Sequence, residues 1–198
     1  MSSFGAILAT PAQVTRVAWF AFLIYWVIAA AGGKKTKKIE SGLDRLSYGV
    51  PLWFAVFLMA VWRVQRGWLG MRFLPESDAI RWTGAALAVA GVGLAIWARR
   101  RLGSNWSTAV TLKEQHELIR NGPYARIRHP IYTGILLAGV GTAIEIGRVV
   151  GLIALPLAWV SFWLKARREE SFLREEFGAR FEEHCRQTGM FLPKLLRR

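Results

Sequence analysis

The segment from Arg128 to Gly134 combines polar groups that could do chemistry at the start of one helix. It reads Arg-His-Pro-Ile-Tyr-Thr-Gly and passes directly into an apolar run. Proline at the first helical position needs no N–H partner and keeps the residue before it out of the helix. A helix start attracts anions, so a carboxylate can sit there beside the Arg128 cation. The simpler interpretation is that Arg128 is an interfacial anchor and His129 a cap.

Upstream, residues 121–124 (Asn-Gly-Pro-Tyr) have the composition of a turn. Such a turn can bring Tyr124 and His116 toward the helix start, where an aromatic ring can stack on a ligand. The turn also has a purely structural explanation, because it reverses the chain.

Downstream, Glu169 and Glu170 directly follow another apolar run, in a region where most charged residues are basic. Lys165 and Glu169 are four residues apart, which places them on one helical stripe. A cation and an acid on that stripe can face the loop together. The alternative is a solvated acidic pair offset by the neighbouring arginines.

The elements that must position these groups are apolar helices. The chain has 198 residues, is 53% hydrophobic and carries a formal charge of +14, a combination typical of membrane helices flanked by basic residues. We therefore expect an all-α integral membrane protein with about five transmembrane helices. Tryptophans near both ends of the runs support the spans. The apolar runs cover residues 14–31, 50–64, 80–98, 131–146 and 149–164.

The last two runs predict an antiparallel hairpin whose tip carries Glu145 and Arg148. Each is about 16 residues, or about 24 Å of helix, slightly short for a crossing. Beyond residue 164 the sequence predicts a cytoplasmic amphipathic helix with Leu173, Phe177 and Phe181 on one face. The basic clusters favour an outside N-terminus and an inside C-terminus. Small residues in the third run, from Gly84 to Ala95, favour close helix packing.

Two parts are expected: residues 1–101 as a three-helix membrane anchor, and residues 102–198 as an integrated domain of binding loop, hairpin and tail helix. Several function classes are excluded. The basic residues form no separate nucleic-acid-binding domain. No strand-associated GxGxxG, P-loop, HExxH or GxSxG motif is present, so the site is not a Rossmann or P-loop site. Cys185 is the single cysteine, no metal site is expected, and the first run looks like an anchor that is retained.

Residues 102–193 resemble the isoprenylcysteine carboxyl methyltransferases, within the wider group of membrane phospholipid methyltransferases. The resemblance rests on Gly-Pro-Tyr at 122–124, on Arg-His-Pro-x-Tyr-x-Gly at 128–134, and on Glu-Glu at 169–170 ahead of Gly178. It implies a site for S-adenosyl-L-methionine built from membrane-protein elements. The cofactor contacts that it implies are Thr111, His116, Leu118, Ile119, Tyr124, His129, Pro130, Ile131, Tyr132, Glu169 and Glu170.

On the acceptor side, the family's arginine falls at Lys165, with Arg167 as a neighbouring candidate and Arg128 as a third. Lysine cannot make arginine's planar bidentate pair with a carboxylate, so this position departs from the family's pattern. The resemblance implies carboxyl O-methylation of a prenylcysteine-like, lipophilic substrate at the cytoplasmic face of a cell inner membrane or the endoplasmic reticulum. A carboxylate acceptor is already ionised at neutral pH, so positioning supplies most of the catalysis.

Three alternatives remain from the sequence. A phospholipid amine can be the acceptor, which requires a base beside the methyl group. The protein can be a membrane scaffold or lipid-binding protein without turnover. It can also be related to the membrane sterol reductases, which use a nicotinamide cofactor, although the chain is short for that class.

Overall fold

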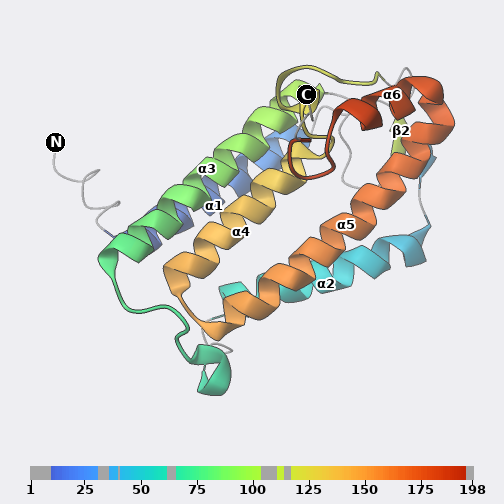
Figure 1. Ribbon diagram of the computed structural model, residues 1–198. Coiled ribbons are helices and arrows are strands. Elements are labelled where there is room, and N and C mark those ends of the chain that lie inside the picture. Colours follow the sequence, from blue (N-terminus) through green and yellow to red (C-terminus); the bar gives the residue numbers. More distant parts are fainter. Residues whose placement is uncertain are drawn as a thin grey trace.

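The computed structural model describes residues 10–30, 36–39, 41–61, 66–103, 111–113 and 117–194. Its elements are long helices joined by short loops and two short strands (Figure 1). The helices are α1 Pro11–Ala30, α2 Gly42–Ala60, α3 Asp78–Leu102, α4 Pro130–Ile146, α5 Val149–Phe177 and α6 Ala179–Gln187. Single 3₁₀ turns are η1 Gly67–Gly70 and η3 Gly122–Ala125, and the strands are β1 Thr36–Ile39 and β2 Thr111–Lys113.

Four of these helices, α1, α2, α3 and α5, are long and apolar enough to cross a membrane. The helix α4 is apolar but has 17 residues. The predicted fold class, an all-α membrane protein, is therefore confirmed. Of the five predicted transmembrane helices, four are long enough to cross a membrane, and α4 is shorter. Exposed apolar side chains such as Phe20, Val27 and Trp53 cover the outside of these helices, as lipid-facing residues do.

Two helix boundaries differ from the prediction. The helix α2 begins eight residues before Val50, because the Ser41 side chain accepts a hydrogen bond from the Asp44 N–H at 3.2 Å and caps an earlier start. The helix that contains the fifth apolar run does not end with that run at Leu164. The helix α5 continues unbroken to Phe177 and stops at Gly178, whose φ of +49° ends it, and α6 follows.

The closest helix pair is α3 with α4. Gly84 and Gly91 of α3 lie directly against Gly141, Gly134 and Ala138 of α4, and a Cβ at any of these glycines would collide with the opposing backbone. Small residues let the two backbones approach as membrane helices do without bulky side chains between them. The packing predicted from the small residues of the third run is confirmed.

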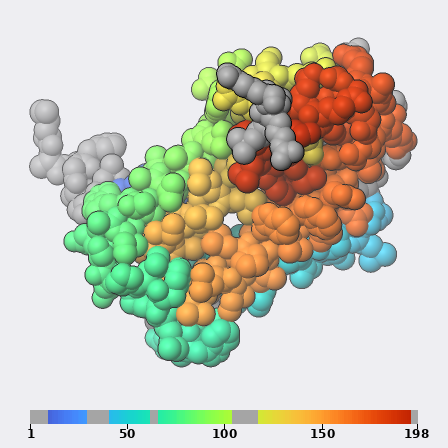
Figure 2. Space-filling model, viewed as in Figure 1, coloured from blue at the N-terminus to red at the C-terminus, as the bar shows by residue number. Residues whose placement is uncertain are grey.

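The helices α4 and α5 follow each other along the chain, but each packs chiefly on another partner. The helix α4 lies on α3, which also carries α1, whereas α5 lies on α2. The Ser161 hydroxyl, which donates to the carbonyl of Tyr48, fixes α5 to α2. Figure 1 shows the two groups side by side, and Figure 2 shows the surface hollowed between α4 and α5. The change of sequence character at residue 101 is not a packing boundary, because α3 packs on α4.

Beyond the helices lies a small ribbon that the sequence analysis did not anticipate. The strands β1 and β2 pair antiparallel, with Ile39 opposite Thr111 and Thr36 opposite Lys113. The ribbon joins two connecting segments at the end of the bundle where α3 ends and α4 begins (Figure 1). At the same end, the buried Arg99 donates to the carbonyl oxygens of Ala29 and Gly103 at 2.6 and 2.8 Å, which ties the end of α1 to the end of α3.

Candidate functional site

The predicted helix start at Pro130 is confirmed, and the side chain before it is the centre of a buried network. His129 is 6% exposed and does not cap the helix with its side chain. Its Nε2 lies 3.2 Å from Oε1 of Glu170, and its Nδ1 lies 3.4 Å from Oε2 of Glu169. A protonated imidazole can donate from both nitrogens, so this ring connects the two carboxylates of α5 to the start of α4.

These contacts change the titration of His129. Burial alone would lower the pKa of His129, but hydrogen bonds to Glu169 and Glu170 and the charges of both carboxylates outweigh it and raise the pKa above 6.5. Burial, followed by the charge of Glu169, raises the pKa of the Tyr124 phenol, so Tyr124 keeps its proton. The site therefore contains acids that favour the protonated form of the imidazole, beside a neutral phenol.

Glu170 is the buried centre of the network. Its side chain is 3% exposed and is held by three basic side chains: Arg128 Nε at 2.7 Å, His129 Nε2 at 3.2 Å, and Arg174 Nη2 at 3.3 Å. Arg128 also donates to the carbonyl of Thr188 at 2.5 Å. A carboxylate so enclosed has little surface left for a ligand. Glu170 therefore positions Arg128 and His129, and α5 is locked to the start of α4.

Glu169 has a different environment from its neighbour. Its side chain is 26% exposed, its Oε1 accepts the hydroxyl of Tyr132 at 2.5 Å, and its Oε2 faces His129. Adjacent helical residues point about 100° apart, so one glutamate can be enclosed while the next keeps an open side. Of the two acids, Glu169 is the one that can reach a ligand.

An aromatic stack lies beside Glu169. The rings of His129 and Tyr132 stack at 5.5 Å, and Tyr132 stacks on Phe162 at 4.9 Å. The Lys165 ammonium lies 5.4 Å from the centre of the Tyr132 ring and 5.5 Å from that of Tyr48. A cation held over aromatic faces is attracted to their π electrons. An acid and a cation on the same turns of α5 thus flank the Tyr132 ring.

The segment after α6 closes this region from the other side. The N–H groups of Arg128 and His129 donate to the carbonyls of Gly189 and Met190 at 2.9 and 3.1 Å, and Gly189 N–H donates back to the Arg126 carbonyl at 3.2 Å. A Cβ at Gly189 would collide with the carbonyl of Leu192, so only glycine fits there. We call residues 188–191 the tail strap; it fixes the backbone on which His129 stands.

The structure brings most of the predicted cofactor residues to this end of the bundle. Tyr124, Ile131 and Tyr132 lie in one buried cluster with Phe162, and Ile119 packs against it. Pro130 is fully buried, and Leu118 is half-buried next to Ile119. Thr111 starts β2 opposite Ile39. His116 lies outside the described residues.

The three predicted acceptor cations separate in the structure. Lys165 lies at the Tyr132 ring, as described above. The Arg167 guanidinium instead lies 5.6 Å over the ring of Trp163, and Arg167 is exposed. Arg128 is engaged by Glu170 and the tail strap, with its side chain only 13% exposed. The three cations therefore do not form one group: Arg128 contacts Glu170 and the tail strap, whereas Arg167 lies apart from Lys165.

Sequence reasoning missed Tyr48, Arg174 and the tail strap. The contact of Arg174 with Glu170 could have been predicted, because Arg174 follows Glu170 by four residues on one helix. Tyr48 was missed because it precedes the predicted start of its helix. Within the residues that the structure describes, no group of three or more His, Cys, Asp or Glu side chains could hold a metal ion. The arrangement suits a cationic ligand beside Glu169 and an anionic one beside Lys165.

Comparisons with known proteins identify the family and the fold of the chain. The family model described as phospholipid methyltransferase matches residues 79–180, from α3 to α6. A probable protein-S-isoprenylcysteine O-methyltransferase of Oryza sativa subsp. indica is 37% identical over 82 residues, which cover 41% of this chain and 43% of that protein. The cobalt-zinc-cadmium resistance protein CzcN of Cupriavidus metallidurans is 31% identical over 125 residues, 58% of this chain and 55% of that one.

A solved structure has the same fold. The eukaryotic intramembrane Ras methyltransferase ICMT superposes with a TM-score of 0.56 at 22% identity, covering 94% of this chain and 69% of that chain. At this identity the likeness shows the fold alone. Because the matched segment is less than half the length of the rice protein, the relatives' activities are not carried over by these matches alone.

Proposed function

Because the chain belongs to the phospholipid methyltransferase family, we propose that this integral membrane protein is an S-adenosyl-L-methionine-dependent methyltransferase whose acceptor is the carboxylate of a prenylcysteine-like, lipophilic substrate. The membership agrees with the resemblance of residues 102–193. The observation that carries the proposal is that a partly exposed acid, Glu169, accepts the Tyr132 hydroxyl while a cation, Lys165, lies near the ring of the same tyrosine.

Glu169, held by the Tyr132 hydroxyl, fits a cationic cofactor. A carboxylate with an open side attracts an ammonium or sulfonium group. When bound, S-adenosyl-L-methionine supplies a methyl group that is already electrophilic. Its contacts in this proposal are Thr111, His116, Leu118, Ile119, Tyr124, His129, Pro130, Ile131, Tyr132 and Glu169, with Glu170 fixing His129 from behind.

Lys165 fits an anionic acceptor. Its ammonium can hold a carboxylate, which is ionised at neutral pH because carboxyl groups titrate near about 4. Such a nucleophile needs no base, so the residues of the site act by orienting the acceptor and excluding water. Lysine is a compact point charge, so it fixes the acceptor's direction less tightly than the arginine implied by the resemblance.

The membrane setting fits a substrate with a hydrocarbon tail. The surface is hollowed between α4 and α5 (Figure 2), beside the apolar faces of both helices, which gives a tail room to lie while its head reaches Lys165. The cofactor is water-soluble, so we place the site at the cytoplasmic face of a cell inner membrane or the endoplasmic reticulum, with the N-terminus outside. The basic clusters at this end agree with that orientation.

The runner-up is N-methylation of a phospholipid amine. Glu169 could accept the proton that a cationic amine must lose, and the name of the family model favours this acceptor. Against it stands Lys165, which lies where we expect the acceptor and, as a cation, can pair with a carboxylate but cannot take the proton that an amine must lose.

Cofactor binding is tested first. The purified protein in a non-ionic detergent is titrated calorimetrically with S-adenosyl-L-methionine, alongside Glu169→Gln and the exposed control Glu176→Gln on the same helix. We expect wild type and Glu176→Gln to bind alike and Glu169→Gln to bind at least about tenfold more weakly, because a charge-assisted contact is lost. A folded wild-type protein that fails to bind contradicts the proposal.

The acceptor is tested by methyl transfer to a farnesylcysteine analogue and to phosphatidylethanolamine. Carboxyl methylation is expected, with Lys165→Met raising the KM for the farnesylcysteine analogue while cofactor affinity is retained. Transfer to phosphatidylethanolamine alone would favour the runner-up.

A further inference from the structure

A polar cavity lies at the opposite end of the helices from the candidate site. It has a volume of about 270 Å³ and is lined by Arg72, Glu76, Arg81, Glu145, Ile146 and Arg148. Three arginines and two glutamates give this lining one net positive charge. Sixteen residues of α4 separate Glu145 from His129, or about 24 Å of helix, so the cavity is independent of the methyl-transfer chemistry.

The cavity is built on a fixed backbone. The N–H of Phe73 donates to the Gly147 carbonyl at 3.0 Å, and Val149 N–H donates to the Met71 carbonyl at 2.9 Å. These bonds form a bridge that sets Arg72 directly opposite Arg148. We call residues 71–74 the loop strap. Arg72 of the loop strap and Arg148 of the turn between α4 and α5 thus line the same cavity.

The floor of the cavity is an ion pair whose acid is buried and whose arginine is partly exposed. Glu145 is 7% exposed and lies 3.3 Å from Arg81 Nη2, which comes from α3. At the rim, Arg72 lies 3.4 Å from Glu76, whose side chain is 76% exposed. Glu145 is therefore committed to the fold, whereas Glu76 is a loosely held acid that another anion can replace.

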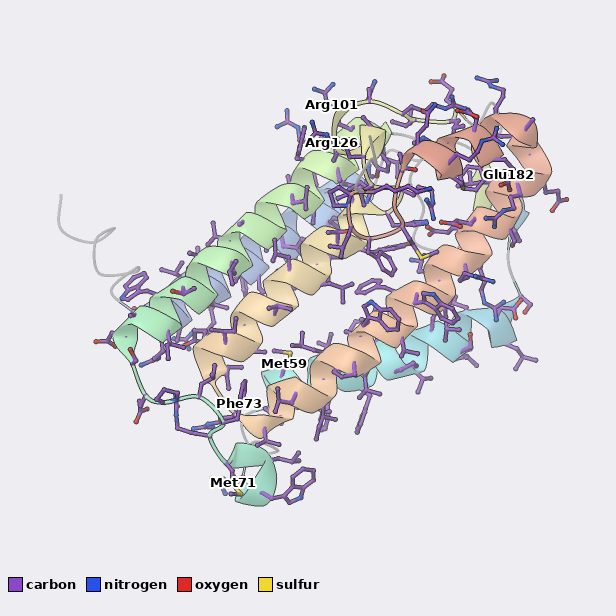
Figure 3. All side chains as sticks on the ribbon, viewed as in Figure 1. Met59, Met71, Phe73, Arg101, Arg126 and Glu182 are labelled. Atoms are coloured by element: carbon purple, nitrogen blue, oxygen red, sulfur yellow. The ribbon has the colours of Figure 1, made fainter. Side chains whose placement is uncertain are left out.

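The surroundings place the cavity at the level of lipid headgroups. Trp68, Met71 and Phe73 of the adjoining loop are exposed, and so is Trp82 on α3 next to Arg81. Exposed tryptophans at the ends of apolar helices sit at the membrane–water interface. Figure 3 labels Met71 and Phe73 at this end, far from Arg126 and Glu182 at the other.

We propose that this cavity binds the phosphate of a phospholipid headgroup, with Arg72 and Arg148 as its principal ligands. Guanidinium groups match phosphate oxygens in pairs, and basic pockets between membrane helices suit anionic headgroups. The start of α5 at Val149 adds its partial positive charge on the same side. Glu76 competes with the phosphate for Arg72.

The test measures binding of dioleoyl-phosphatidylglycerol to the delipidated full chain by native mass spectrometry in a non-ionic detergent. Dioleoylglycerol, which has the same tails and no phosphate, is the control probe. We expect one phosphatidylglycerol to bind per chain, about tenfold more weakly in Arg72→Gln and in Arg148→Gln. Glu76→Gln removes the competing acid and should bind the lipid more tightly. Arg66→Gln changes the same charge at the same end outside the cavity and should bind as wild type does.

Circular dichroism and gel filtration show that each variant is folded, and neither depends on methyltransferase activity. A second arm adds soluble glycerol 3-phosphate as competitor. If it displaces the lipid from wild type but has no effect on Arg148→Gln, the site takes phosphate from water as well as from lipid. Equal lipid binding by wild type, Arg72→Gln and Arg148→Gln, or equal binding of dioleoylglycerol, overturns the proposal.

Discussion

The two ends of α4 are held by the same kinds of contact, an ion pair and a backbone bridge. The ion pairs differ in their exposure to water. Each end has a glutamate paired with an arginine from another segment and a backbone bridge to a distant strap: Glu145 with Arg81 and the loop strap at one end, Glu170 with Arg128 and the tail strap at the other. The arginine side chain is 32% exposed in the first pair and 13% in the second.

This difference separates two roles. At the enclosed end, three basic side chains surround one carboxylate, and the geometry around His129 is fixed before any ligand arrives. At the open end, the arginines face a cavity that water and headgroups can enter. Burial makes an ion pair a rigid support, whereas partial exposure leaves its cation able to bind another anion.

The largest effect is expected from removing the buried acid. Glu170→Ala leaves Arg128 without its carboxylate and His129 with Glu169 alone, which costs about 3–5 kcal/mol of unfolding free energy. Glu145→Ala should cost about 1–3 kcal/mol, because Arg81 can turn toward water. Both are measured by denaturant unfolding in detergent, with the exposed Glu176→Ala as control. Equal losses at Glu170 and Glu145 would remove the distinction between the two ends.

A second prediction concerns the helix contact that joins the two ends. In Gly91→Ala the new Cβ meets the backbone of Gly134 and Ala138, so α3 and α4 must separate, at about 1–3 kcal/mol. Gly93→Ala, two residues away in the same helix, meets nothing within 4 Å and should be neutral or about 0.5–1 kcal/mol more stable.

Hydrogen exchange then shows whether both ends depend on this contact. In Gly91→Ala, faster exchange is expected in the loop strap and in the tail strap, whereas Gly93→Ala should exchange as wild type does. Faster exchange at one end alone would show that the two ends are held independently.

At these two ends of α4, the features that could be predicted from the sequence are those that depend on local signals. The start of α4 at Pro130 and the small residues of α3 were predictable, because proline and glycine act on their own backbone and on the nearest helix. The membrane class followed from the length of the apolar runs. The predicted start of α2 was wrong because the cap at Ser41 begins the helix before the hydropathy changes. Tyr48, which lies in this earlier part of the helix, was therefore not predicted.

The distinct roles of Glu169 and Glu170 were not predictable from their order. The sequence alone does not distinguish the environments of two adjacent acids. The positions of Tyr132 and Arg128 in three dimensions decide which acid is enclosed. The tail strap and the β1–β2 ribbon depend on contacts between segments far apart in the chain, which no local pattern reports. Lys165 was identified from the family resemblance, and its place between two aromatic rings became visible only with Tyr48.

A third prediction concerns the hydroxyl that holds Glu169. Tyr132→Phe keeps the stacking on His129 and Phe162 and removes one hydrogen bond to a carboxylate, which should cost about 1–2 kcal/mol. Cofactor affinity should fall by several-fold, measured by calorimetry, because Glu169 loses one of its two partners. As a matched control, Trp19→Phe removes a hydrogen bond to Thr142 remote from the site and should leave cofactor affinity unchanged.

The smallest effect is a pH dependence at the enclosed end. The folded pKa of His129 lies above 6.5, because its contacts with Glu169 and Glu170 outweigh the opposing effect of burial. The folded state thus binds the proton more tightly than the unfolded chain. The stability that His129 contributes is fully present below about pH 6.5 and is lost as pH rises through the folded pKa. His184 has the opposite sign: burial, then the charges of Arg120 and Arg128, lower its pKa, so its contribution is present above about pH 6.5 and lost as pH falls through the folded pKa.

The two histidines can be separated by variants. The difference in unfolding free energy between wild type and His129→Gln should shrink from pH 6 to pH 9, and that between wild type and His184→Gln should shrink as pH falls from 7 to 5. A difference for His129→Gln that grows with pH would mean that the imidazole is neutral in the folded protein. In that case His129 could donate a hydrogen bond to only one of the two glutamates, and the network would no longer bridge α4 to both acids of α5.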